Sequence, residues 1–166
     1  VYPPHSLRQA RNRTLRSRRD RHLVFRLRAR PGNRGRIDRG GPVRVSRHLA
    51  GRGGGAIVFI GSVAGKTGGT SLYTPIDYAA SKGGVHTLVK WLSRRAVGKG
   101  VLVNGVAPGP VETPMTANNA MDKSVLPRGR MGRPEEIAWM IAMLLTPAAG
   151  YVSGAVLDVN GGSFVG

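Results

Sequence analysis

The sequence predicts an α/β protein built on a parallel β-sheet, and three observations after residue 50 support this. Short apolar runs rich in β-branched residues, typical of buried parallel strands, occur three times. Stretches with apolar residues at helical spacing separate these runs. Segments rich in glycine and proline bound each stretch. Strands that alternate with helices in this way favour a parallel sheet with right-handed crossovers.

The boundaries of the elements follow from local signals. In the first helix Val85, Leu92 and Ala96 lie at helical spacing, and Gly98 ends it. The second helix has Pro134 in its first turn, followed by two acidic residues that favour the positive end of the helix dipole. In chain order we expect a glycine-rich turn at 51–55, a strand at 56–60, a loop at 61–75, a helix at 77–96, a strand at 101–107, a helix from 133 that ends at Thr146, and a strand at 155–159.

The first 50 residues differ in composition from the rest. The 166-residue chain has a formal net charge of +18, and residues 1–52 alone contain 16 arginines, no lysine and two acidic residues. The best apolar cluster there, Leu23-Val24-Phe25, is flanked by arginines. Three interpretations stay open: a basic arm that contacts phosphates, a solvated disordered tail, and a GC-rich gene read out of frame. We expect 1–50 to be a disordered or out-of-frame segment and 51–166 to form the domain, with nucleic-acid binding as the alternative function.

Several classes of protein are excluded by composition. No run of 18 apolar residues is present, and the N-terminus has no apolar secretory segment, so we expect a cytoplasmic protein without a membrane partner. The absence of cysteine excludes a disulfide scaffold, a thiolate zinc site and a cysteine nucleophile. The four histidines are scattered, so we expect no metal site.

Tyr78 and Lys82 carry the clearest chemical signal. They are four residues apart in the predicted helix at 77–96, so their side chains share one face. A free tyrosine, with a pKa near ~10, is a poor base at neutral pH, but a nearby ammonium group lowers that pKa and makes tyrosine a usable proton donor and acceptor. Ser62 follows the carboxyl end of a predicted strand, where open α/β sheets bind ligands, so its hydroxyl is placed to orient a substrate carbonyl. Taken alone, this spacing is also compatible with an exposed helix face.

The surrounding motifs resemble the short-chain dehydrogenase/reductase family. The similarity extends over about 115 residues and five motifs in the family's order. The motifs are the serine segment at 60–65, the Tyr-x-x-x-Lys helix at 78–84, the strand and loop at 103–113, the Gly-Arg-Met-Gly-Arg-Pro-Glu-Glu-Ile segment at 129–137, and the final strand at 154–162. The overall pattern is most similar to 3-oxoacyl-carrier-protein reductase-like members, and the resemblance does not define the substrate.

The resemblance implies an oxidoreductase that interconverts a carbonyl and a secondary alcohol by hydride transfer with NAD or NADP. Tyr78 is then the general acid or base, Lys82 lowers its pKa and holds the nicotinamide ribose, and Ser62 polarises the carbonyl. Ser71 is a rival to Ser62, but the residues that flank Ser62 fit the family's motif better. The cofactor residues implied are Tyr78, Lys82, Pro108, Gly109, Val111 and Thr113. Asn104 is expected to be structural.

The chain also departs from the family. It has no Gly-x-x-x-Gly-x-Gly turn for the cofactor's pyrophosphate and no Asn-Asn-Ala-Gly motif. We therefore expect an incomplete Rossmann-type doubly wound sheet that lacks its N-terminal strands, with weakened cofactor binding. Two alternatives stay open: the chain is active as an oxidoreductase, or it is an inactive remnant of a family member. Family resemblance further implies a small-molecule carbonyl or alcohol substrate and a homo-oligomer, with Trp91 and Trp139 as packing or interface residues.

Overall fold

The fold is an α/β structure with a parallel sheet, as predicted. The computed structural model describes residues 41–69, 74–114, 116 and 122–166, and the backbone of 22–25. Within this part the sheet has four strands in the order β1-β2-β3-β4, all parallel. The strands are β1 (His22–Phe25), β2 (Gly55–Ile60), β3 (Val101–Pro108) and β4 (Val156–Val159).

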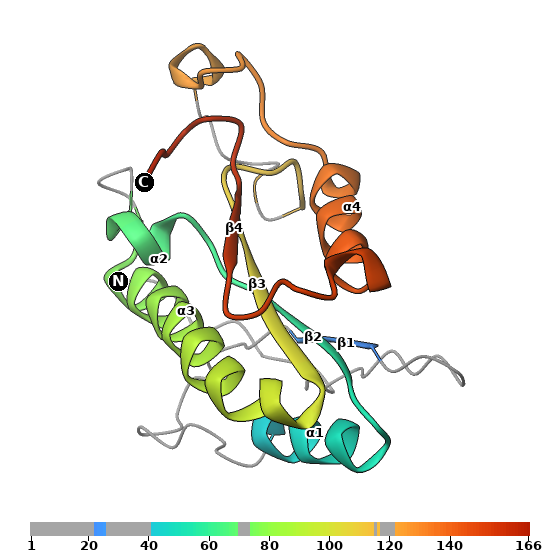
Figure 1. Cartoon of the computed structure of the whole chain (residues 1–166). Helices are drawn as coiled ribbons and strands as arrows, with labels where there is room; N and C mark the ends of the chain where they lie inside the picture. Colours follow the sequence, from blue (N-terminus) through green and yellow to red (C-terminus); the bar gives the residue numbers. More distant parts are fainter. Residues whose placement is uncertain (1–21, 26–40, 70–73, 115, 117–121) are drawn as a thin grey trace.

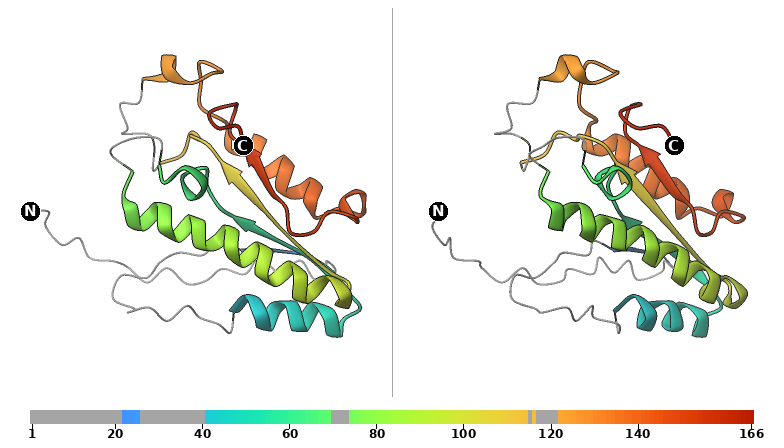
Figure 2. Two further views of the ribbon diagram at one scale, coloured as in Figure 1. Left: turned by 60° about the vertical axis from the view of Figure 1, so that its left-hand side comes forward. Right: turned by 90° about the vertical axis from the view of Figure 1, so that its left-hand side faces the viewer.

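Helices cover both faces of the sheet (Figures 1 and 2). Helices α1 (Gly41–Gly51) and α3 (Ile76–Ala96) pack on one face, and α4 (Pro134–Leu144) packs on the other. A short helix, α2 (Ala64–Thr67), lies within the segment expected to be a loop. Three 3₁₀ turns complete the described elements: η1 (Val97–Lys99), η2 (Lys123–Val125) and η3 (Pro147–Ala149).

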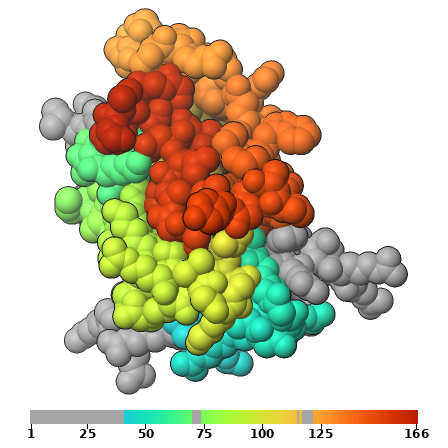
Figure 3. Space-filling model, in the orientation of Figure 1, coloured from blue at the N-terminus to red at the C-terminus, as the bar shows by residue number. Residues whose placement is uncertain are grey.

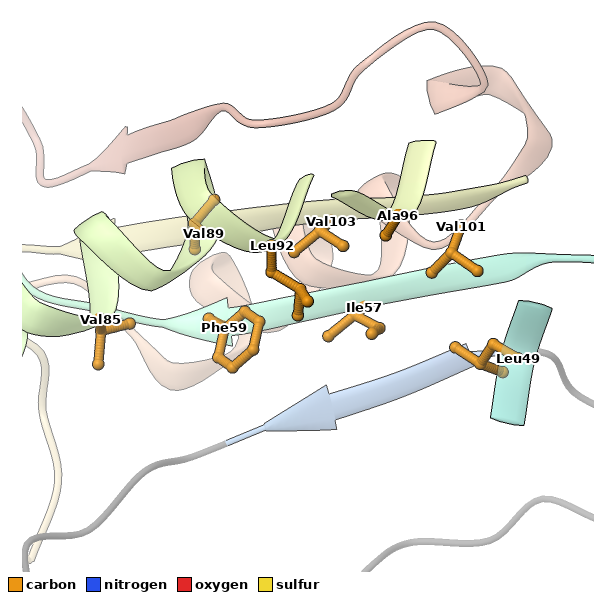
Figure 4. Close-up of a cluster of buried hydrophobic side chains, with 9 residues drawn as sticks. All are labelled: Leu49, Ile57, Phe59, Val85, Val89, Leu92, Ala96, Val101 and Val103. Atoms are coloured by element: carbon orange, nitrogen blue, oxygen red, sulfur yellow. The ribbon is translucent and has the colours of Figure 1, made fainter. Parts of the chain in front are cut away.

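The core divides at the sheet because successive side chains of a strand point to opposite faces. Ile57 and Phe59 of β2 point toward α3, while Val58 packs with α4, and all three are fully buried. Figure 4 shows the α3 side of this core, including Leu49 from α1. The buried members of that cluster are Leu49, Ile57, Phe59, Val85, Val89, Leu92, Ala96, Val101 and Val103.

A glycine turn aligns the two central strands. Gly54 has a φ of +110°, and a Cβ there would lie 2.4 Å from the carbonyl oxygen of Gly100, so only glycine fits. The N–H of Gly55 donates to the same oxygen at 3.0 Å. Strands β2 and β3 therefore start together, pairing Gly55 with Val101, and stay in register as far as Ile60 and Val106, after which β3 continues to Pro108. Their carboxyl ends meet at one edge of the sheet.

The last crossover differs from the expected right-handed pattern. The strand order advances in one direction from β1 to β4, yet α4 lies on the face opposite α1 and α3. Two crossovers that advance in the same direction over opposite faces must have opposite hands, so the expectation of uniform right-handed crossovers is wrong for β3 to β4. The connection between β3 and α4 is long and extends from residue 109 to residue 133.

Two elements lie before the predicted start of the domain at residue 51. Helix α1 begins at Gly41, and its buried Leu49 belongs to the core. The backbone of β1 pairs with β2 from His22↔Ala56 to Phe25↔Phe59, so this edge of β2 carries a strand. The other residues of the Arg-rich segment lie outside the described part. Within the described residues, no helix is both long and apolar enough to cross a membrane.

Candidate functional site

Ser62 lies at the carboxyl edge of the sheet, immediately after β2. The residue is 8% exposed, and its Oγ accepts a hydrogen bond from the N–H of Ala64 at 3.2 Å. The next residue, Val63, donates its N–H to the carbonyl oxygen of Pro108 at 3.0 Å. This bond joins the segment after β2 to the end of β3, so the serine segment and the 108–113 loop form one edge.

Tyr78 and Lys82 approach the same edge from the start of α3. Lys82 Nζ donates to the carbonyl oxygen of Ile60, the last residue of β2, at 3.1 Å. The same Nζ lies 5.7 Å from the centre of the ring of Tyr78, a residue that is 38% exposed. The tyrosine therefore has a solvent-accessible ring beside an ammonium group that is bonded to the sheet.

Close packing of α2 on α3 sets the position of the serine relative to this helix. A Cβ on Gly65 would lie 2.5 Å from the carbonyl carbon of Lys82 and 2.7 Å from the nitrogen of Gly83. Backbone atoms cannot give way as a flexible side chain can, so glycine is required for this approach. The serine segment and the Tyr78–Lys82 turn are thereby held close together.

The loop after β3 is held by hydroxyl groups. Thr116 Oγ1 donates to the carbonyl of Val111 at 2.7 Å and accepts from the N–H of Thr113 at 2.9 Å. Val111 also forms a parallel bridge with Gly132. Among the described residues nothing accepts the Val111 N–H. This loop therefore presents the backbone donor of Val111, and the Thr113 hydroxyl lies 3.3 Å from Thr116 Oγ1.

Gly109 brings the same loop against the end of β4. A Cβ at Gly109 would lie 3.0 Å from Cα, Cβ and O of Asn160, and the Gly109 N–H donates to the carbonyl of Val159 at 3.2 Å. The site residues expected from the sequence are thus distributed along one sheet edge: Ser62, Tyr78, Lys82, Pro108, Gly109, Val111 and Thr113. No hydrogen bond joins the Ser62 and Tyr78 hydroxyls among the described residues. The rival Ser71 lies outside them, as do residues 1–21 and 26–40 of the basic arm considered for nucleic acid.

Charged groups behind the serine were not singled out from the sequence. Lys66 of α2 forms an ion pair of 2.5 Å with Asp158 of β4, and His86 of α3 lies buried beside them. Burial lowers the pKa of His86, and the positive charge of Lys66 lowers it further. Lys66 and Asp158 are 92 residues apart, so spacing alone carried no signal for this group.

Asn104 has the structural role expected from the sequence. It is 1% exposed, and its Nδ2 donates to the carbonyl of Val152 at 2.7 Å. Its Oδ1 accepts the N–H of Ala155 at 3.1 Å. The side chain thus satisfies two backbone groups before β4.

Residues 41–163 match a family model described as enoyl-(acyl carrier protein) reductase. The chain is 39% identical over 126 residues to a 3-oxoacyl-[acyl-carrier-protein] reductase of Vibrio harveyi. The matched stretch covers 73% of this chain and 50% of that protein. The chain belongs to the short-chain dehydrogenase/reductase family. A galactitol 2-dehydrogenase (L-tagatose-forming) of Cereibacter sphaeroides is 42% identical over 123 residues, covering 70% of this chain and 48% of that protein.

Solved structures of this short-chain dehydrogenase/reductase family also match. A glucose/ribitol dehydrogenase-type member from Brucella melitensis is 40% identical, with a TM-score of 0.61, and the match covers 67% of this chain and 46% of that chain. An acetoin dehydrogenase from Salmonella typhimurium is 33% identical, with a TM-score of 0.62 and coverage of 72% and 49%. The sheet is thus an incomplete Rossmann-type fold, and the chain spans about half the length of the relatives it matches.

Proposed function

We propose that this chain carries the catalytic part of an NAD(P)-dependent oxidoreductase that interconverts a carbonyl and a secondary alcohol. The observation that carries the proposal is the approach of Ser62, Tyr78 and Lys82 to one sheet edge, with Lys82 bonded to Ile60 at the end of β2. A hydroxyl, a phenol and an ammonium group together suit proton transfer to and from an oxygen atom. Membership of an oxidoreductase family supports the same reaction class.

In the direction of reduction, the Tyr78 hydroxyl donates a proton to the substrate oxygen. The ammonium group of Lys82, 5.7 Å from the ring centre, lies beside the phenolate that remains, and solvent at the exposed Tyr78 returns the proton. The Ser62 hydroxyl donates a hydrogen bond to the same oxygen and so draws electron density from the carbonyl carbon. It can do so while its oxygen accepts the Ala64 N–H, because a hydroxyl has a donor hydrogen besides its acceptor lone pairs.

The described residues fit the nicotinamide end of a dinucleotide. The Val111 N–H, which bonds to none of the described residues, and the Thr113 hydroxyl suit a carboxamide, and Lys82 suits ribose hydroxyls. Pro108 and Gly109 shape the start of the loop that carries Val111 and Thr113. NAD or NADP, when bound, supplies or accepts the hydride. Because the sequence has no Gly-x-x-x-Gly-x-Gly turn, we expect the chain by itself to bind the cofactor weakly.

A small carbonyl or alcohol is the proposed substrate. The relatives named above are a 3-oxoacyl-[acyl-carrier-protein] reductase, a galactitol dehydrogenase and an acetoin dehydrogenase. A short 3-oxoacyl thioester is therefore a suitable first probe. The homo-oligomer that we also propose rests on exposed apolar side chains of α4 and its surroundings, above all Trp139, which is 74% exposed.

The test is reduction of a short 3-oxoacyl thioester by the full chain with NADH and with NADPH, followed by the loss of cofactor absorbance. Tyr78→Phe removes the proton donor and is expected to lower kcat by about 10²- to 10⁴-fold. Tyr151→Phe is the matched control, because Tyr151 is fully exposed and distant in sequence from the site. Turnover that survives in Tyr78→Phe would contradict the assignment, and saturable cofactor binding measured by fluorescence separates a binding defect from a chemical one.

A further inference from the structure

The ring of His86 lies directly against the backbone that leads into Ser62. Both residues are 8% exposed. The N–H of Ser62 donates to His86 Nε2 at 3.5 Å, a long bond in a buried setting. A Cβ on Gly61 would lie 2.3 Å from Nε2 and 2.7 Å from Cδ2, so glycine at 61 is what admits the ring.

We propose that His86 is a positioning residue for Ser62, holding it for reaction only while the imidazole is neutral. This rests on the proposed function, because it assigns a regulator to the hydroxyl that polarises the carbonyl. With Nε2 as the acceptor, the ring proton is on Nδ1. Protonation turns Nε2 into a second donor facing the Ser62 N–H, so the bond is lost and two donors oppose each other.

The groups around the ring determine when this happens. Lys66 of α2 and Lys82 and Lys90 of α3 oppose a positive charge on His86, and Asp158 of β4 favours it. Burial is the largest influence, and together these effects lower the pKa of His86 below its ordinary value of 6.5. The neutral ring is therefore retained at physiological pH, and the position of Ser62 is lost only as the pH falls through the lowered pKa.

The close approach of the His86 ring to Gly61 distinguishes this arrangement from ordinary core packing. A buried histidine that only fills space needs no nitrogen at the Ser62 amide, whereas here the ring edge with its acceptor nitrogen fills the space that a Cβ would take. The serine hydroxyl belongs to the same residue as the amide, so a shift of this peptide moves Oγ as well.

The test uses NMR titration of the ¹⁵N-labelled full chain, which needs no turnover. We expect the Ser62 amide proton and the His86 ring protons to titrate with one shared midpoint below pH 6.5. A Ser62 amide that stays unchanged through the His86 midpoint would overturn the proposal. His48→Gln, at an exposed histidine of α1, is the matched control and is expected to leave both titrations unchanged.

His86→Gln supplies the second measurement. Its amide oxygen can accept the Ser62 N–H at every pH, so we expect the Ser62 amide to lose its titration. If the chain turns over, kcat of the unmodified chain is expected to fall at low pH, and this fall should disappear in His86→Gln. His86→Leu, in contrast, is expected to lower kcat about 10- to 100-fold with little change in KM. An unchanged fall of kcat at low pH in His86→Gln would contradict the proposal. Absence of any turnover would count against the proposed function alone, since the NMR titration still decides the role of His86.

Discussion

Asn104 shows how a single buried polar residue joins distant segments. It lies in the middle of β3, where an apolar residue would normally be expected, and holds the backbone at Val152 and Ala155 with both ends of its amide. A buried amide is stable in a core only when such partners are present. The segment that leads into β4 is thereby fixed to the sheet.

Replacing this amide tests its role. We expect Asn104→Leu to lower the free energy of unfolding by about 2–4 kcal/mol, because it leaves two backbone groups without partners. Urea denaturation followed by circular dichroism measures the change. Thr87→Ala, at an exposed position of α3, is the control and should change stability by less than ~0.5 kcal/mol. A loss as small as that of the control would show that water replaces the lost bonds.

Glu136 links α4 to the segment before it. Arg130 donates to both carboxylate oxygens at 2.9 and 2.8 Å, and the N–H of Arg133 donates at 2.7 Å. The bonds from Arg130, with that from Arg133, lower the pKa of Glu136 to about 2. Its stabilising contribution is therefore fully present above its ordinary pKa of 4.5 and is lost as the pH falls through about 2.

A carboxyl-carbon NMR titration checks this assignment. We expect the Glu136 midpoint near 2 in the unmodified chain and a rise toward 4.5 in Arg130→Gln. Arg128→Gln removes a neighbouring exposed arginine that does not bond to Glu136, so the midpoint should stay near 2. The same midpoint in both variants would mean that Arg130 does not determine the acidity of Glu136.

At the scale of elements, glycines decide how closely α2 approaches α3. Gly65 meets backbone atoms of Lys82 and Gly83, whereas a Cβ on Gly84 would meet nothing within 4 Å. Two glycines of neighbouring elements are thus expected to respond to alanine with opposite signs.

We expect Gly65→Ala to destabilise the fold by about 1–3 kcal/mol, because α2 must move away from α3. Gly84→Ala should stabilise it by about 0.5–1 kcal/mol, because alanine loses less backbone entropy in a helix interior. Thermal or urea unfolding of both variants measures the difference. Equal effects in the two variants would show that α2 is not held by this contact.

At the scale of the whole molecule, the apolar surface is uneven. Trp139 and Met143 lie four residues apart on α4 and both are exposed, and Tyr151 follows shortly after the helix. The space-filling view shows α4, η3 and the C-terminal segment together on one face (Figure 3). Large exposed aromatic side chains are enriched at interfaces between proteins, so this face is the one that we propose for self-association.

A charge placed on this face tests the proposed homo-oligomer. We expect the unmodified chain to have a mass above its 17.6 kDa monomer in size-exclusion chromatography with light scattering. Trp139→Glu should shift it toward the monomer, because it buries a charge in the interface. Val125→Glu, an equivalent change at another exposed apolar residue, should not. A monomeric mass for the unmodified chain would exclude the proposal.

Much of the fold was determined by local patterns that need no tertiary information. The apolar runs at 56–60 and 101–107 correspond to β2 and β3, and the periodic stretches correspond to α3 and α4. Buried strands and amphipathic helices leave such patterns because burial selects apolar residues at the spacing of the element. The Tyr78–Lys82 pair could also be predicted from local spacing, because four residues complete about one helical turn and place both side chains on one face.

Other features depend on contacts between residues that are distant in sequence. The hand of the last crossover depends on which face α4 covers, and the apolar periodicity of 133–146 predicts a buried helix face without naming the face of the sheet. The strand at 22–25 forms by pairing with β2, although its arginine-rich surroundings give no periodic signal. The Lys66–Asp158 pair and the contact of His86 with the Ser62 amide join separate elements. Periodicity reports the spacing of residues along one element, whereas these features arise from how the elements pack, and only the tertiary structure decided them.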